Sequence, residues 1–125
     1  MKPPATILIA DRNRHVRELL KREMAAEGYR IRLAKNGQEV LHGLADTKCL
    51  DLLILDPDLP GVNELHIMED LRNRTPALPI IVHTYLQDFL DGRKVFSTAA
   101  LVEKNGHNID RLKQAVAEAL RKTEV

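Results

Sequence analysis

The sequence has no tryptophan, and aromatic residues make up only 3% of it, so aliphatic side chains must fill its core. Its single cysteine, Cys49, excludes a disulfide within the chain and fits a reducing compartment. No apolar run approaches the length of a membrane span, and the opening residues 1–4 are too few for a signal peptide. The 19 basic and 18 acidic residues nearly cancel. We therefore expect a cytoplasmic protein that binds neither nucleic acid nor membrane directly.

Length and composition suit one compact domain. A chain of 125 residues with 44% hydrophobic content can bury one core, which we expect over about 5–122 of a single domain spanning 1–125. Four segments are almost uniformly apolar, as expected for strands buried on both faces of a parallel sheet. They lie at 6–10, 52–55, 80–82 and 99–102. Between 29 and 33 apolar residues alternate with arginines, which predicts an edge strand with one wetter side.

Helical patterns separate these strands. Asn13 can cap a helix that Gly28 ends. Apolar residues at helical spacing predict further helices over 38–45, 65–71, about 86–96 and 109–120. Strands that alternate with helices form five βα units, which predict an α/β fold whose parallel sheet is covered on both faces.

Polar residues follow the apolar segments at one edge of this sheet, beyond the carboxyl ends of the strands, where such folds bind ligands. They are Asp11, Arg12, Asp56, Thr84 and Lys104. A carboxylate can attack a phosphoryl group to form an acyl phosphate, while an ammonium and a hydroxyl bind the phosphoryl oxygens. Asp56, Lys104 and Thr84 can supply these three parts. Asp11 can supply part of the oxygen shell of a divalent ion such as Mg²⁺.

These motifs resemble those of response regulator receiver domains of two-component signalling. The resemblance covers residues 7–120. It is carried by Ile-Leu-Ile-Ala-Asp at 7–11, Leu-Ile-Leu-Asp at 53–56, Pro60-Gly61, Pro-Ile-Ile-Val-His-Thr at 79–84 and Glu103-Lys104. The resemblance implies a flavodoxin-like, doubly wound, five-stranded parallel sheet with five helices.

The resemblance also implies roles for particular residues. Asp56 would accept a phosphoryl group from the phosphohistidine of a sensor histidine kinase or a phosphotransfer protein, in a self-catalysed transfer that does not make the chain a conventional enzyme. Thr84 and Lys104 would couple the phosphoryl group to a face formed by the fourth helix, fifth strand and fifth helix. A downstream effector, or a second copy in a homodimer, would bind that face. Asp11, Asp56 and Asp58 would hold Mg²⁺.

The sequence departs from the family pattern at three positions. Arg12 stands where a second acidic residue usually contacts the metal, Leu101 where an aromatic switch residue is usual, and Asn105 where proline usually follows the lysine. Replacing a carboxylate by a cation should weaken Mg²⁺ binding, because an ion pair at contact distance contributes on the order of a few kcal/mol. We predict that Arg12 pairs with Asp56 or Asp58 in place of the metal. A surface arginine in a loop is the alternative.

Two other functions stay open at this stage. A pseudo-receiver would keep the fold as an interaction module without useful phosphorylation, and Arg12 and Leu101 both favour it. Acetyl phosphate or beryllofluoride with Mg²⁺ would separate the two. The run Asp56-Pro57-Asp58 also resembles the opening of haloacid dehalogenase-type phosphatases. However, Pro60 stands where that motif has a small Thr or Val, and the chain lacks the length for their cap.

Overall fold

The computed structural model describes residues 3–45, 50–74, 77–85, 100–104 and 109–122. Its strands are β1 (Thr6–Ala10), β2 (Arg30–Ala34), β3 (Leu52–Leu55), β4 (Ile80–Thr84) and β5 (Ala100–Glu103). Its helices are α1 (Arg14–Ala26), α2 (Gly37–Ala45), α3 (Ile67–Arg72) and α5 (Ile109–Lys122). The helix predicted over about 86–96 lies outside the described residues. Within the described ranges, every helix is too short or too polar to span a bilayer.

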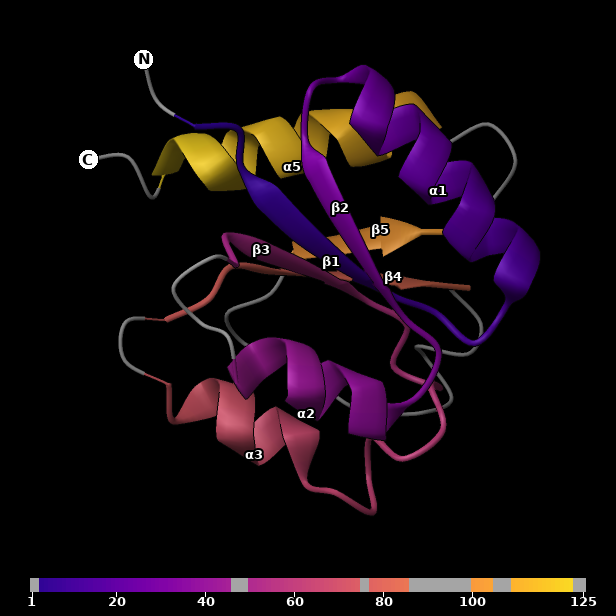
Figure 1. Cartoon of the computed structure of the whole chain (residues 1–125), viewed down its shortest axis with the longest axis vertical. Helices are drawn as coiled ribbons and strands as arrows, with labels where there is room; N and C mark the ends of the chain where they lie inside the picture. Colours follow the sequence, from indigo (N-terminus) through magenta and orange to yellow (C-terminus); the bar gives the residue numbers. More distant parts are fainter. Residues whose placement is uncertain (1–2, 46–49, 75–76, 86–99, 105–108, 123–125) are drawn as a thin grey trace.

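One sheet forms the centre of the molecule (Figure 1). Its five strands are parallel and lie in the order β2-β1-β3-β4-β5. Helices α1 and α5 cover one face of the sheet, and α2 and α3 cover the other (Figure 1). This arrangement confirms the predicted flavodoxin-like, doubly wound fold, with four helices in the described part of the chain against five expected.

Aliphatic side chains form a separate buried layer on each face of the sheet. On one face Ile9 packs with Leu20 of α1 and Val116 of α5. On the other face Leu8 packs with Val40 of α2. Because alternate residues of a strand point to opposite faces, the uniformly apolar β1 supplies both layers. This explains why that segment shows no polar alternation.

Strand β2 lies at one edge of the sheet, as its alternating sequence predicted. Arg30 and Arg32 are exposed. Ile31 and Leu33 are partly buried against the layer beneath α1 and α5. The strand therefore needs apolar residues on one side only, and arginines on the other are tolerated.

Helix α1 begins at its predicted cap. The side-chain Oδ1 of Asn13 accepts hydrogen bonds from the amides of His15 and Val16 at 2.8 and 3.2 Å. These bonds satisfy two of the amides that a helix start leaves without partners. After the helix, Gly28 has a φ of +96°, a conformation that side-chain-bearing residues rarely adopt.

Helix α3 begins at Ile67, two residues later than the apolar pattern from Leu65 suggested. The residue before it, His66, has a φ of 52°, which is incompatible with a right-handed helix. The amide of Leu65 instead donates to the carbonyl of Gly61 at 3.0 Å. A turn therefore replaces the expected first part of the helix.

The segment after β3 is held against the start of α2. The amide of Gly37 donates to the carbonyl of Pro60 at 2.6 Å. A Cβ atom at Gly37 would lie only 2.7 Å from the backbone carbon of Gly61. This close backbone contact fixes where the chain runs after it leaves Asp56.

Candidate functional site

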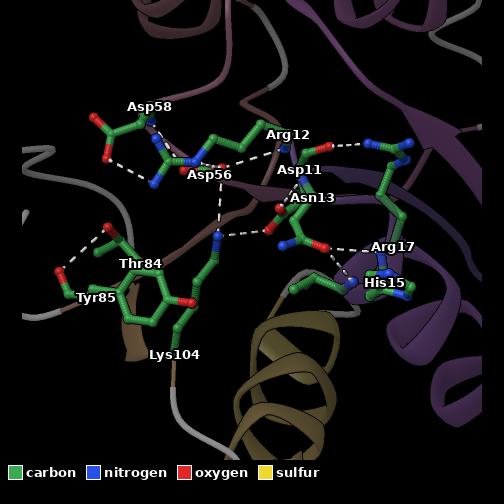
Figure 2. A network of polar contacts seen from close by, with 11 residues as sticks. Asp11, Arg12, Asn13, His15, Arg17, Asp56, Asp58, Thr84, Tyr85 and Lys104 are labelled. Carbon is green, nitrogen blue, oxygen red and sulfur yellow. Dashed lines mark hydrogen bonds and ion pairs between the residues drawn. The ribbon is translucent and has the colours of Figure 1, made fainter.

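Backbone hydrogen bonds that extend the sheet hold three of the predicted site residues. The amides of Asp11, Asp56 and Lys104 donate to carbonyls of β2, β1 and β4 at 3.1, 2.8 and 2.7 Å, respectively. Their side chains therefore start from rigid positions at the carboxyl ends of neighbouring strands. The predicted convergence at this edge is confirmed for these residues (Figure 2).

Asp56 is the centre of the cluster and is only 1% exposed. Its Oδ1 accepts a hydrogen bond from the amide of Asp58 at 3.0 Å. Its Oδ2 accepts one from the amide of Arg12 at 3.3 Å and lies 3.4 Å from Lys104 Nζ. Both carboxylate oxygens thus face donors or positive charge, which stabilises a buried ionised carboxylate.

Lys104 joins the two buried carboxylates. Its Nζ lies 2.8 Å from Asp11 Oδ2, closer than to Asp56, and all three side chains are almost fully buried. The other oxygen of Asp11 accepts a hydrogen bond from the amide of Asn13 at 2.9 Å. Removing the ammonium would take this ion pair from the buried Asp11 and leave Asp56 with the cation of Arg12, which is destabilising.

Arg12 contacts two carboxylates, as predicted. Its Nε lies 3.5 Å from Asp56 Oδ2, and a terminal nitrogen lies 3.8 Å from Asp58 Oδ2. The side chains of Arg12 and Asp58 are 43% and 44% exposed, whereas that of Asp56 is 1% exposed. The guanidinium therefore links the buried carboxylate of Asp56 to the partly exposed carboxylate of Asp58 (Figure 2).

Thr84 is buried at the end of β4, but its hydroxyl points elsewhere in this structure. Its Oγ1 donates to the carbonyl of Tyr85 at 3.4 Å, a long and therefore weak hydrogen bond. The role of Thr84 as a ligand of a phosphoryl group stays a prediction.

His83 is a buried histidine beside this cluster. Burial lowers its pKa to about 4, and the positive charge of Lys104 adds to the lowering while Asp56 opposes it. Its Nδ1 has no hydrogen-bond partner in the part of the chain that the structure describes. His83 is therefore neutral at pH 7, and its Nδ1 takes no part in the hydrogen bonds of the site.

The carboxylates of the site do not fit a divalent cation as they stand. Among the residues with a described placement, no three His, Cys, Asp or Glu side chains form a group that could hold a metal ion. Asp11, Asp56 and Asp58, the predicted ligands, each contact Lys104 or Arg12 instead. A Mg²⁺ ion about 4 Å from the guanidinium would meet a repulsion on the order of a few kcal/mol. Binding of Mg²⁺ by these carboxylates stays a prediction.

Two residues of the site were not predicted. Arg17 of α1 donates from a terminal nitrogen to the carbonyl of Asp11 at 2.7 Å. The ring centroid of Tyr85 lies 5.5 Å from Lys104 Nζ, within range of a cation–π contact. The position of Tyr85 directly after Thr84 could have indicated this contact, because β4 and β5 are neighbours.

Comparison with known proteins agrees with this geometry. The family model for the response regulator receiver domain matches residues 7–118, most of the chain. The chain belongs to this family. The response regulator MprA of Mycolicibacterium vanbaalenii is 37% identical over 81 residues, which cover 65% of this chain and 35% of MprA. The chain thus spans about a third of the length of the curated relatives it matches.

Solved structures of receiver domains share the fold. The response regulator TrrA of Thermotoga maritima, in complex with Mg²⁺ and BeF, is 33% identical, with a TM-score of 0.77. The match covers 92% of this chain and 98% of TrrA. A response regulator receiver domain protein from Bacillus halodurans has a TM-score of 0.76 over 93% of this chain and 97% of its own. Its identity of 15% supports the fold alone.

The receiver domains to which this chain belongs are a family of signalling domains. The chain places Asp56, Thr84 and Lys104, the acidic, hydroxyl and lysine positions that the resemblance implies, at the carboxyl ends of β3, β4 and β5. Its departure at Leu101 lies on β5, where the side chain is 37% exposed and pairs in register with Val82. Asn105, the third departure, lies outside the described residues.

Proposed function

We propose that this receiver accepts a phosphoryl group on Asp56 from a phosphohistidine and switches a protein-interaction face in response. One observation carries the proposal: the buried Asp56 carboxylate has its Oδ2 3.4 Å from Lys104 Nζ. A carboxylate beside an ammonium is placed to attack a phosphoryl group whose negative charge the ammonium neutralises.

The proposed step is a phosphoryl transfer between a nitrogen and an oxygen. Asp56 Oδ2 bonds to phosphorus while the phosphorus–nitrogen bond breaks, and the electron pair leaves with the imidazole of the donor. Lys104 then binds one oxygen of the acyl phosphate. Thr84 binds another once its hydroxyl turns away from the carbonyl of Tyr85. Because β4 pairs with β5, a shift at Thr84 is passed to the strand that carries Leu101.

The partners follow from this role. A sensor histidine kinase or a phosphotransfer protein would donate the phosphoryl group, and an effector would read the face that includes β5 and α5. The name response regulator that MprA carries supports this assignment. A homodimer through the same face is part of the proposal, as is a single cytoplasmic domain over residues 1–125. No direct contact with nucleic acid or membrane is required.

Chemical labelling of the acceptor tests the proposal. We expect phosphoramidate, in buffer with and without Mg²⁺, to add one phosphoryl group to the wild-type protein, seen by intact-mass spectrometry. Asp56→Asn should remain unlabelled because the amide is not a nucleophile. Asp110→Asn makes the same change at an exposed position of α5 and should label like the wild type. Equal labelling of Asp56→Asn and wild type would contradict the assignment.

The pseudo-receiver is the second candidate, and one observation favours it. Arg12 Nε lies 3.5 Å from the same Oδ2 that would attack phosphorus, so the guanidinium partly neutralises the nucleophile. In that case the wild type would stay unlabelled under all conditions, while Arg12→Asp would label with Mg²⁺ present.

A further inference from the structure

Arg12 gives this site a fixed positive charge from the protein itself. Asp11, Asp56 and Asp58 contribute three carboxylates, and Arg12 and Lys104 contribute two cations that contact them, so the formal charge of the cluster is −1 without any metal ion. Figure 2 shows the two cationic groups approaching Asp56 from different sides. Arg12 therefore supplies, from the protein itself, part of the positive charge that a divalent ion would bring to this cluster.

The placement of the guanidinium suits an incoming phosphoryl group. Its contacts with Asp56 and Asp58, at 3.5 and 3.8 Å, are longer than the roughly 2.7–2.9 Å of a charge-assisted hydrogen bond. Its side chain is 43% exposed, between the buried acceptor and solvent, where a phosphoryl donor must approach. The planar fork of arginine can donate to two phosphoryl oxygens at once.

We propose that Arg12 replaces the divalent ion, so that Asp56 accepts phosphoryl groups without metal. The inference rests on the proposed phosphoacceptor function and specifies its chemistry. Arg12 binds the phosphoryl oxygens on the solvent side, and Lys104 binds them on the buried side. This division follows from the exposure of the two side chains, 43% for Arg12 and 6% for Lys104.

The step balances without a metal ion. A bond forms between Asp56 Oδ2 and phosphorus, and the phosphorus–nitrogen bond of a phosphohistidine or a phosphoramidate breaks. The leaving nitrogen takes the electron pair and a proton from water. The two cations offset the charge that develops on the transferring oxygens, which is the main requirement of phosphoryl transfer.

Labelling rates in chelator and in Mg²⁺ test this inference. We would follow phosphoramidate labelling of wild type, Arg12→Gln, Arg12→Asp and Arg14→Asp by intact mass, each with EDTA and with excess Mg²⁺. We expect the wild type to label at the same initial rate in both buffers. In EDTA, Arg12→Gln and Arg12→Asp should label about a hundredfold more slowly, as expected when a positioned donor to a transition-state oxygen is lost. Arg12→Asp should recover in Mg²⁺. Arg14→Asp makes the same charge change at an exposed position and should behave like the wild type.

The outcomes separate this inference from the function on which it rests. Wild type that labels only with Mg²⁺ would overturn the role of Arg12 while leaving Asp56 as a phosphoacceptor. Equal rates for wild type and Arg12→Gln in EDTA would overturn it as well. Wild type that labels in neither buffer would overturn the phosphoacceptor function and the inference together.

Discussion

His83 is a titratable side chain in a buried position that disfavours its charged form. It is 8% exposed on β4, its pKa is lowered to about 4, and its Nδ1 has no partner among the described residues. An unpartnered buried polar atom costs on the order of 1–3 kcal/mol. The histidine is therefore tolerated only while it stays neutral.

This burial predicts a stability that depends on pH. The unfolded chain, with a histidine pKa of about 6.5, takes up a proton as the pH falls, whereas the folded chain does not until about 4. The contribution of the neutral His83 to the free energy of unfolding is thus fully present above about pH 6.5 and is lost as the pH falls. We expect the wild type to lose about 2 kcal/mol more than His83→Leu between pH 7 and pH 5, measured by urea unfolding.

A matched substitution identifies the source of this loss. His15 is exposed at the start of α1, so His15→Gln should keep the wild-type difference between the two pH values. If His83→Leu lost the same stability as the wild type on acidification, burial of the histidine would not be the cause.

Residue-level contacts were predictable where neighbouring strands impose them. The pairing of Arg12 with Asp56 and Asp58 follows because β1 and β3 are adjacent and end at the same edge. The direction of the Thr84 hydroxyl and the contact of Arg17 with the carbonyl of Asp11 were not predictable. Both depend on side-chain rotamers, which the order of polar and apolar residues does not determine.

Among the elements, α2 and the segment after β3 are in close backbone contact. Gly37 at the start of α2 leaves no room for a Cβ, whose distances to the carbonyl carbon and oxygen of Gly61 would be 2.7 and 2.8 Å. The atoms it would meet are mostly backbone, which cannot move aside cheaply. The start of α2 therefore packs directly against the loop that follows β3.

Two alanine substitutions in α2 test this contact. We expect Gly37→Ala to destabilise the fold by about 1–3 kcal/mol, because overpacking forces the two backbones apart. At Gly43 a Cβ would meet Leu8 Cδ2 at 3.1 Å, the end of a flexible side chain. Alanine also gains about 1 kcal/mol of helix propensity there, so Gly43→Ala should stay within about 1 kcal/mol of the wild type. Urea unfolding of both variants makes the comparison, and equal stabilities would contradict it.

Element types were predictable from periodicity, but one boundary was not. The apolar residues of α3 continue helical spacing back to Leu65. The left-handed backbone of His66 nevertheless prevents the helix from starting before Ile67. Local backbone conformation decided this boundary, since the apolar pattern was satisfied either way. By contrast, the edge position of β2 followed directly from its alternating arginines.

For the whole molecule, the balance of charge in the site links metal binding to stability. A ligand that binds only the folded state raises the free energy of unfolding, by about 2.7 kcal/mol at a hundred times its dissociation constant. We expect millimolar Mg²⁺ to leave the melting temperature of the wild type unchanged and to raise that of Arg12→Asp by several degrees. Differential scanning fluorimetry measures both. Mg²⁺-free buffer of matched ionic strength is the control, and a rise for wild type would show that the guanidinium does not exclude the ion.

The parallel sheet covered on both faces was also predictable, because short apolar strands alternate with amphipathic helices. Its doubly wound form was implied by the resemblance to receiver domains. What the order of residues could not settle is whether the cluster binds a metal. That depends on the distances among four charged groups, and these distances emerge only when the strand ends are placed side by side.

The contact between Tyr85 and Lys104 has a practical consequence for spectroscopy. The ring lies 5.5 Å from the ammonium, and the chain has only two tyrosines and no tryptophan. In a Tyr29→Phe protein, tyrosine emission would therefore arise from a single ring at the edge of the site. Binding of an anion that moves Lys104 changes the electric field at the ring of Tyr85. The receiver thus carries an intrinsic optical probe, and occupancy of its site can be followed in real time without a label.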